Sequence, residues 1–240
     1  MAQTNLGTYS EWHDARIRST LAHLTRYVPR ARPFTLLDLG HDPKMGPRLQ
    51  ALGAEVTGNV YPGSPLPSDC SWKLAPFDLE QGFPFADDSF DVVTAFEVIE
   101  HVVSTPRALL REAARVLKPG GVLYLGTPNV CAWAKVRRLM SHVHPYDSAA
   151  YGLKFDGRHP MCHVYEYEPW TLKRLVASEG FSIVACDTWD PYENDPTGPR
   201  DALLRMLVTG SLAVTGHLKD AAQLWRNRGH QIGLAAMRQP

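Results

Sequence analysis

Two glutamates and a histidine stand close together near the middle of the chain. Glu97, Glu100 and His101 follow an apolar run at 90–96, and their i, i+3 and i+4 spacing places all three on one face if a helical turn begins after Phe96. An imidazole with an ordinary pKa of about 6.5 is suited to remove a proton from a hydroxyl or an amine. Two carboxylates and an imidazole can instead bind a divalent cation that orients a hydroxyl pair and lowers its pKa. A structural role, in which the residues cap a helix or shape a pocket, is the third interpretation.

Alternating strands and helices surround this cluster and must position it. The apolar runs expected as strands are 34–39, 54–58, 72–79, 90–96, 122–126, 181–189 and 232–237. The stretches with helical spacing or helix-start residues are 9–30, 46–52, 104–117, 170–178 and 201–227. This alternation is typical of a doubly wound parallel sheet, in which ligands bind beyond the carboxyl ends of the strands. The cluster at 97–101 stands at such an end.

The length of 240 residues suits one α/β domain over 1–240. We expect an N-terminal helix in residues 1–33, a substrate-side insert at 130–168, and a loop with a helical insert at 190–230 before the last strand. The insert at 130–168 is rich in His and Tyr, which suits stacking and hydrogen bonding to an acceptor. The apolar stretch at 203–214 has three interpretations: a core helix, a dimer contact, or a wall for a lipid-like acceptor.

Charge and composition bear on the class of protein. Lys+Arg and Asp+Glu both count 25, so the formal net charge is zero, and nothing attracts the whole chain to nucleic acid or to an anionic membrane. A net charge of zero does not exclude a local basic patch. The four cysteines form no C-x-x-C pair, which indicates free thiols in a reducing compartment. No run reaches the roughly 18 apolar residues of a membrane span, and the N-terminus lacks a signal-peptide core. We expect a soluble cytoplasmic protein, with the oligomeric state open and a homodimer as one option.

Three ordered blocks carry a resemblance to a known family. Residues 78–93 contain the sequence FPFADDSFD, residues 96–102 read FEVIEHV, and residues 115–121 read RVLKPGG. Together they resemble the central half of class I S-adenosylmethionine-dependent methyltransferases. The resemblance implies an α/β, Rossmann-like, doubly wound fold with a mostly parallel seven-stranded sheet whose last strand is antiparallel. It also implies S-adenosylmethionine as the cofactor.

The resemblance assigns cofactor contacts to particular positions. Asp38 would hold the amino group of the donor, Gly40 would let backbone approach it, Asp78 would lie near the adenine amine, and Leu79 would lie against the ring. Phe96 would border the same pocket at the end of its strand.

Two positions depart from the family pattern. The first loop reads DLGHDPKMG over 38–46, so the second and third glycines are absent or displaced. The second strand ends at Gly58 and Asn59 without a carboxylate for the ribose, and we expect Asn59 to hydrogen-bond the ribose instead.

The stretch EVIEH carries a second resemblance. It is similar to the metal-binding stretch of the ubiquinone-pathway O-methyltransferases and of the small-RNA 2′-O-methyltransferases. In the latter a further downstream histidine completes the site, and His163 stands where it could do so. The resemblance implies a metal set of Glu97, Glu100, His101 and His163 that binds Mg²⁺ or Mn²⁺. The catalytic residues would then be His101, Glu97 and His163.

The expected function is transfer of a methyl group to an oxygen of a small molecule, a glycan or a lipid-linked acceptor. The stretch from His163 through Glu166 and Tyr167 to Phe181 resembles bacterial methyltransferases of biosynthetic pathways. Two alternatives remain. The chain could be a methyltransferase-like protein that has lost methyl transfer and acts as a binding or partner subunit. It could also be an RNA 2′-O-methyltransferase, although zero net charge makes nucleic acid an unlikely partner.

Overall fold

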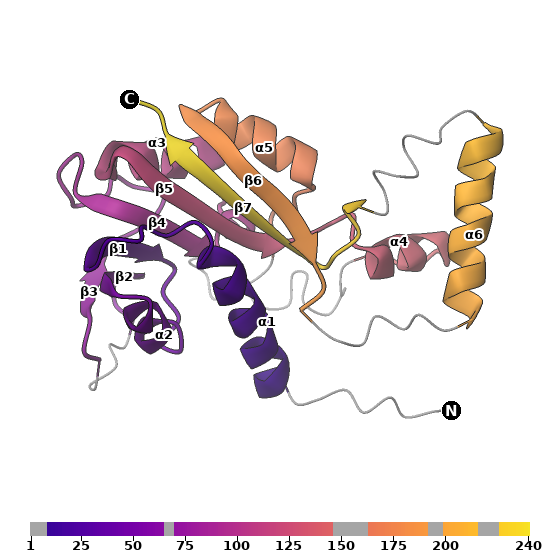
Figure 1. The fold of residues 1–240 in the computed structure, drawn as a ribbon, viewed down its shortest axis with the longest axis horizontal. Coiled ribbons are helices and arrows are strands. Elements are labelled where there is room, and N and C mark those ends of the chain that lie inside the picture. The colour runs from indigo at the N-terminus through magenta and orange to yellow at the C-terminus, as the bar shows by residue number, and fades with distance from the viewer. Residues whose placement is uncertain (1–8, 65–69, 146–162, 192–198, 216–225) are drawn as a thin grey trace.

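The computed structural model describes residues 9–64, 70–145, 163–191, 199–215 and 226–240. Seven strands form one sheet, in the order β3-β2-β1-β4-β5-β7-β6 (Figure 1). The strands are β1 (Phe34–Leu39), β2 (Ala54–Val60), β3 (Lys73–Pro76), β4 (Phe90–Phe96), β5 (Leu117–Pro128), β6 (Phe181–Trp189) and β7 (Gln231–Arg238). The helices are α1 (Tyr9–Leu24), α2 (Gly46–Ala51), α3 (Pro106–Val116), α4 (Trp133–Met140), α5 (Pro169–Ala177) and α6 (Pro199–Val214), with a short 3₁₀ helix η1 (Ile99–His101).

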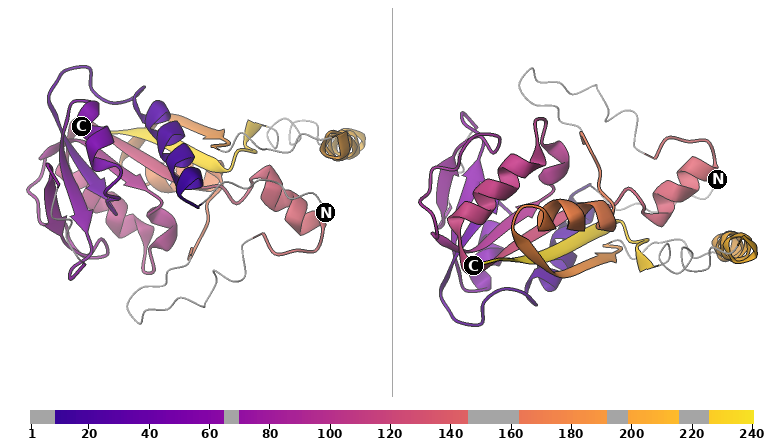
Figure 2. Two further views of the ribbon diagram at one scale, coloured as in Figure 1. Left: turned by 90° about the horizontal axis from the view of Figure 1, so that it is seen from below. Right: turned by 90° about the horizontal axis from the view of Figure 1, so that it is seen from above.

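The sheet confirms the expected fold class. Strands β1 to β5 pair in parallel, and β7 lies antiparallel between β5 and β6. Helices cover both faces (Figures 1 and 2). On one face α3 and α5 bury residues such as Leu110 and Leu172, and on the other α1 and α2 bury Ile17 and Leu49. Burial on both faces explains why β1 and β4 read as continuous apolar runs.

Several element boundaries differ from the sequence-based expectation. Helix α1 ends at Leu24, six residues before the predicted end, and the following residues form turns. Strand β5 already begins at Leu117, so the Lys118–Gly121 segment that was expected to separate helix and strand belongs to the strand, with Gly120 at φ +75°. Thr105 caps α3, because its hydroxyl accepts a hydrogen bond from the backbone of Arg107. Residues 146–162 of the expected insert and 216–225 of the expected last helix lie outside the described residues.

Helices α4 and α6 lie away from the sheet, next to each other, at the end of the molecule to which β5 leads (Figures 1 and 2). The apolar side chains of Leu203, Met206 and Leu207 on α6 are exposed to solvent. The core interpretation of this helix is therefore wrong. No helix in the described part of the chain is both long and apolar enough to span a bilayer.

A buried polar contact holds α1 on the sheet. His23 Nδ1 lies 2.8 Å from the Tyr124 hydroxyl of β5, and His23 Nε2 lies 2.9 Å from the Asp187 carboxylate of β6. The imidazole also stacks on Trp189, with ring centroids 4.8 Å apart. Burial raises the pKa of Tyr124 well above its ordinary value, so this hydroxyl stays protonated. The contact matters for function because α1 carries charged side chains to the carboxyl edge of the sheet.

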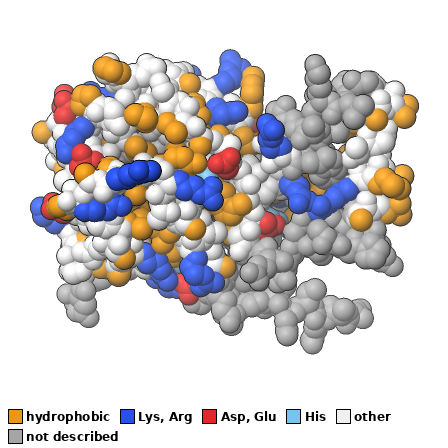
Figure 3. All heavy atoms as spheres, viewed as in Figure 1, with side chains coloured by type: hydrophobic (Ala, Val, Ile, Leu, Met, Phe, Trp, Pro, Cys, Tyr) orange, Lys and Arg blue, Asp and Glu red, His pale blue; other side chains and the backbone are white. Residues whose placement is uncertain are grey.

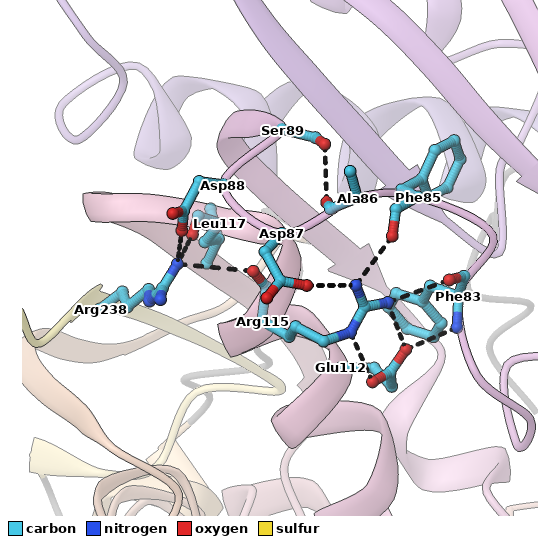
Figure 4. A network of polar contacts seen from close by, with 10 residues as sticks. All are labelled: Phe83, Phe85, Ala86, Asp87, Asp88, Ser89, Glu112, Arg115, Leu117 and Arg238. Carbon is cyan, nitrogen blue, oxygen red and sulfur yellow. Dashed lines mark hydrogen bonds and ion pairs between the residues drawn. The ribbon is translucent and has the colours of Figure 1, made fainter.

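The turn that precedes β4 is tied to α3 by one arginine (Figure 4). The Arg115 guanidinium donates to the carbonyl oxygens of Phe83 and Phe85 and to the carboxylates of Asp87 and Glu112, over 2.7–3.0 Å. The hydrogen bond from Arg115 outweighs burial and lowers the pKa of Glu112. Residues 82–89 thus form a turn closed by Arg115 together with Glu112, whose carboxylate also accepts a hydrogen bond from the Phe83 backbone at 2.6 Å.

Replacing this arginine tests the network. We expect Arg115→Met to lower the free energy of unfolding by about 2 kcal/mol, because two backbone carbonyls and Glu112 lose a charged donor. Denaturant unfolding measures the effect. Arg48→Met is the control, since 37% of the Arg48 side chain is accessible, and its loss should cost no more than about 0.5 kcal/mol. Equal effects of the two substitutions would contradict the role given to Arg115.

Candidate active site

The turn after β1 passes very close to the end of β4. Gly40 has φ +64°, and a Cβ built at this position would lie 2.5 Å from Cγ2 of Val98. Both the left-handed backbone and the lack of space require glycine here. The backbone of the turn therefore lies open at the carboxyl edge of the sheet, as the family resemblance implies for this position.

The next residue, His41, fills the space beneath the turn. Its ring packs on Gly58 so closely that a Cβ there would lie 2.5 Å from the imidazole. His41 Nδ1 lies 2.7 Å from the carboxylate of Asp38, and the Thr94 hydroxyl donates to the other oxygen of the same carboxylate. Asp38 is only 1% exposed and lines neither of the two pockets described below. In this structure Asp38 supports the turn rather than facing the cleft.

Asn59 also holds the turn. Its side-chain oxygen accepts a hydrogen bond from the Gly40 backbone, and its side-chain nitrogen donates to the carbonyl of Phe77. The His41 backbone donates to the Asn59 carbonyl at 2.9 Å. The amide expected to bind a ribose is thus already committed to protein partners. Asn59 nevertheless lines the second pocket described below, so a ligand in that pocket would lie beside this residue.

The expected adenine contacts lie beyond the end of β3. Asp78 is half-buried, and its carboxylate accepts a hydrogen bond from the Glu80 backbone. Leu79 is partly buried and packs on the core under α3. Neither residue lines the two pockets described here.

The first pocket, called the α1 pocket, lies between α1 and the carboxyl ends of β1 and β4 and has a volume of about 190 Å³. Its lining residues are His13, Arg16, Ile17, Thr20, Gly40, Asp42, Met45, Phe96, Glu97 and Gln231. Phe96 thus borders a pocket, as predicted. The lining combines apolar walls with several charged groups.

These charged groups form a continuous chain across the α1 pocket. The Asp42 carboxylate lies 2.5 Å from His13 Nε2, and His13 Nδ1 accepts from Arg16 at 2.9 Å. Arg16 forms an ion pair with Glu97, whose second oxygen accepts from Gln231 at 2.6 Å. Burial alone would raise the pKa of Asp42, but the hydrogen bonds from His13 and from the Lys44 backbone outweigh it, and the pKa is lowered. The pocket therefore holds fixed groups of both signs.

Glu97 does not share a helical face with the other two residues of its motif. Its φ is +55°, a left-handed conformation that is uncommon outside glycine, and only Ile99–His101 form a helical turn. The expectation of one shared face for Glu97, Glu100 and His101 is therefore wrong. The left-handed residue turns the Glu97 carboxylate into the α1 pocket, toward Arg16.

The second pocket, called the β2 pocket, lies beyond the ends of β1 and β2 and has a volume of about 220 Å³. Its lining residues are Gly40, His41, Pro43, Asn59, Val60, Tyr61, Ser64 and Leu74. Gly40 lines both pockets. Each pocket alone is smaller than a usual ligand site of roughly 300–1,000 Å³. A ligand of two unlike halves, one charged and one largely apolar, could extend across Gly40 and use both.

A separate cluster joins the rest of the motif to the downstream histidine. Glu100, His101 and His163 each offer one ligand atom, and these atoms lie within 4.8 Å of one another. Glu100 is fully buried; one oxygen accepts from Thr127 at 2.8 Å, and the other has no hydrogen-bond partner and lies 4.0 Å from His101 Nε2. Burial, reinforced by the charge of Glu97, raises the pKa of Glu100 well above its ordinary value.

The donor set fits a divalent ion, because an unpartnered buried carboxylate oxygen is costly unless something binds it. One carboxylate and two imidazoles suit Mn²⁺ or another transition ion better than Mg²⁺, which prefers oxygen ligands. Glu97 is not part of this cluster, so three of the four expected ligands come together.

His163 is held by residues outside the predicted set. Its Nδ1 lies 2.7 Å from the buried Glu166 carboxylate, which also forms an ion pair with Lys135 of α4. The two hydrogen bonds outweigh burial and lower the pKa of Glu166, so it stays ionised. The backbone of Val164 donates to the Glu100 carbonyl at 2.7 Å. These contacts fix the imidazole beside His101, and the two rings lie edge to face at 4.9 Å.

The sequence therefore located most of the site but missed its α1 side. The residues that sequence reasoning did not single out are His13, Arg16, Asp42, Gln231 and Lys135, whereas Glu166 was named only as part of the stretch after His163. His13 and Arg16 stand at i and i+3 on the first helix, which was the one available signal. Gln231 lies 134 residues from its partner Glu97, and no local pattern connects them.

The sheet order and the two pockets at its carboxyl edge define the protein class. A family model described as a methyltransferase domain matches residues 59–125. The chain thus has the Rossmann-like methyltransferase fold, with the family match over this segment.

Particular relatives are similar over parts of the chain. The ubiquinone biosynthesis O-methyltransferase of Methylobacterium nodulans is 35% identical over 130 residues, which cover 47% of this chain and 50% of that protein. The enzyme of the same name from Xanthomonas oryzae pv. oryzae is 56% identical over 41 residues, 17% of each chain. The chain thus spans half the length or less of these relatives. A crystal structure of an S-adenosylmethionine-dependent methyltransferase from Mesorhizobium loti superposes with a TM-score of 0.55 at 17% identity, covering 95% of this chain and 100% of that one. It supports the fold alone.

A pair of glycine substitutions tests the close approach at the turn. Gly40→Ala should destabilise the protein by about 2–3 kcal/mol and abolish binding of S-adenosylhomocysteine, because the new methyl group must displace Val98. Gly120→Ala introduces the same backbone strain, since Gly120 has φ +75°, but a Cβ built there meets no atom within 4 Å. This variant should therefore lose about 1–2 kcal/mol of stability and bind the ligand normally. Thermal unfolding and calorimetric titration measure both. Normal binding by Gly40→Ala would refute the account of the turn.

Proposed function

We propose that this protein transfers the methyl group of S-adenosylmethionine to an oxygen of a small molecule, a glycan or a lipid-linked acceptor. One observation carries the proposal: the α1 pocket and the β2 pocket meet at Gly40, at the carboxyl ends of β1 and β4. This is the edge where parallel α/β sheets bind ligands. The names of the O-methyltransferase relatives support oxygen as the acceptor atom.

The chemistry of the two pockets matches the two halves of the donor. The donor's amino-acid end carries an ammonium and a carboxylate, and the α1 pocket offers Glu97 and Arg16, groups of the opposite signs. The nucleoside end is flat and largely apolar, and the β2 pocket offers Val60, Tyr61 and Leu74. Binding would exchange the Arg16–Glu97 ion pair for contacts to the ligand. The sulfonium methyl would then lie between the pockets, near Phe96.

The reaction needs alignment and a proton acceptor. The acceptor oxygen attacks the methyl carbon as the carbon–sulfur bond breaks, which gives a methyl ether and S-adenosylhomocysteine. Alignment of donor and acceptor supplies most of the rate. His101 is the proton acceptor of choice, because it is the most exposed member of its cluster, with 36% of its side chain accessible. Glu100 and His163 lie beside His101, and the hydrogen bond to Glu166 fixes the imidazole of His163.

A divalent ion in this cluster is the alternative to His101 as proton acceptor, because a metal-bound imidazole has no lone pair left for the proton. Glu100, His101 and His163 would hold it, and when bound it would orient an acceptor hydroxyl and lower its pKa. The unpartnered oxygen of Glu100 favours this assignment.

The donor assignment is tested on α1. Arg16→Gln should weaken S-adenosylhomocysteine binding about tenfold or more, because the ligand's carboxylate loses its cationic partner. Arg18→Gln is the matched control on the exposed side of the same helix and should leave the affinity unchanged. Isothermal titration measures both. No heat from wild-type protein at saturating S-adenosylhomocysteine would contradict the donor assignment itself.

The metal assignment has an independent readout. We expect Mn²⁺ to bind the wild-type protein in electron paramagnetic resonance titrations, and Glu100→Gln to weaken this binding about tenfold or more, since a neutral amide is a poorer ligand. Glu55→Gln, an exposed position on β2, is the control. Mn²⁺ affinity that is equal in all three proteins would rule out this cluster as a metal site.

The competing function is a binding subunit without methyl transfer. The absence of the second and third family glycines from the first loop and the missing carboxylate after β2 favour it. It predicts that neither S-adenosylmethionine nor S-adenosylhomocysteine binds. RNA methylation is favoured by the Glu100, His101 and His163 cluster alone, and failure to bind RNA oligonucleotides at low salt would exclude it.

A further inference from the structure

The two ring nitrogens of His41 have different surroundings. Nδ1 lies 2.7 Å from the Asp38 carboxylate, whereas Nε2 is buried and has no hydrogen-bond partner among the described residues. Only 1% of the His41 side chain is accessible, and the face drawn in Figure 3 likewise shows little histidine among its many basic and apolar side chains. A buried polar atom without a partner is rare and costly, and it indicates a place where a ligand group can bind.

The contacts of Asp38 determine which hydrogen bond His41 Nε2 can make. A carboxylate can only accept hydrogen bonds, and one oxygen of Asp38 accepts from the Thr94 hydroxyl at 2.6 Å. The other oxygen faces His41 Nδ1, so the hydrogen of a neutral imidazole belongs on Nδ1. Nε2 then carries the lone pair of the ring. His41 therefore offers a hydrogen-bond acceptor, which a hydroxyl group of a ligand would satisfy.

This acceptor belongs to a residue that lines the β2 pocket. Asp38 and Thr94 line neither pocket, so the Nδ1 edge of the His41 ring, which faces them, is not the edge that borders the cavity. Asn59 lines the same pocket, but its side-chain oxygen and nitrogen are both hydrogen-bonded to the backbone. The imidazole therefore brings to the pocket an acceptor that no protein group uses.

Neighbouring groups hold the ring of His41 in one orientation. A Cβ at Gly58 would lie 2.5 Å from Cγ of the imidazole, so the ring fits only because that position is glycine. The ring of Trp72 packs edge to face on the other side, with centroids 5.4 Å apart. The backbone of His41 donates to the Asn59 carbonyl at 2.9 Å. A ligand that binds Nε2 would not have to pay for ordering this side chain.

We infer that His41 Nε2 recognises the sugar of the donor by accepting a hydrogen bond from one of its ribose hydroxyls. The inference rests on the proposed donor site and extends it, because the β2 pocket is the part assigned to the nucleoside. Residues 58–61 read GNVY and supply no carboxylate for the sugar, and the side chain of Asn59 is already bonded. Asp38 is then a positioning residue, which acts through the imidazole that it orients.

Deoxy analogues of the ligand test the inference on the full chain. Calorimetric titration compares S-adenosylhomocysteine with its 2′-deoxy and 3′-deoxy analogues. Wild-type protein should bind one of the two analogues about tenfold or more weakly, because the missing hydroxyl leaves the buried acceptor without a partner. His41→Asn should remove this difference. Its side-chain amide can still donate to Asp38, but no atom replaces Nε2.

Two further variants separate recognition from general effects on the turn. His41→Gln has a longer side chain that can place an acceptor oxygen near the position of Nε2, so it should keep part of the discrimination. His142→Asn makes the same substitution at an exposed histidine after α4 and should discriminate like wild type. A purely structural role of His41 would weaken all three ligands equally and leave the ratio of their affinities unchanged.

A measurement on wild-type protein does not depend on the variants being stable. In nitrogen-15 NMR of histidine-labelled protein, the assigned Nε2 resonance of His41 should move when S-adenosylhomocysteine saturates the site, and it should move less with the analogue that binds weakly. An Nε2 resonance that stays in place with saturating S-adenosylhomocysteine would overturn the inference.

The titrations distinguish two kinds of failure. Equal affinities of wild-type protein for all three ligands, or a difference that persists in His41→Asn, would overturn the role of His41 while the donor assignment stands. If S-adenosylhomocysteine itself does not bind, the donor assignment fails, and this inference fails with it.

Discussion

The residue that follows the first strand must be glycine, because Val98 occupies the place that a Cβ at position 40 would take. This close approach brings the ends of β1 and β4 together and leaves backbone, rather than side chains, at the junction of the α1 pocket and the β2 pocket. Everything proposed for the site depends on it. A larger residue would push apart the two strands that carry the cleft and the Glu97–His101 segment.

The turn that follows lacks the further glycines of its family, and the structure replaces their effect with side-chain contacts. His41 fits beneath the turn because position 58 is glycine, and its imidazole is fixed by the buried Asp38 carboxylate. Asn59 fastens the same turn from β2. Hydrogen bonds between buried polar groups make a turn rigid. The loop thus keeps an open junction at Gly40 by a different set of interactions, with Asp38 and Asn59 hydrogen-bonded to protein groups of the turn.

The sequence predicted the features that depend on local pattern and missed those that depend on contacts between distant segments. Apolar runs of strand length gave the parallel sheet, and the family resemblance gave the antiparallel last strand. Nothing local to Glu97 indicates its left-handed backbone, which follows from a chain path that aims its carboxylate at Arg16, 81 residues away. Periodicity likewise predicted an apolar face on α6, but not that this face is left exposed.

A crystal structure of the protein with S-adenosylhomocysteine tests the central claim most directly. The ligand's amino-acid end should lie in the α1 pocket with its carboxylate on Arg16, its sulfur near Phe96, and its nucleoside in the β2 pocket, so that the molecule crosses over Gly40. A ligand bound elsewhere, or a cleft that stays closed by the Arg16–Glu97 ion pair at saturating ligand, would contradict the account.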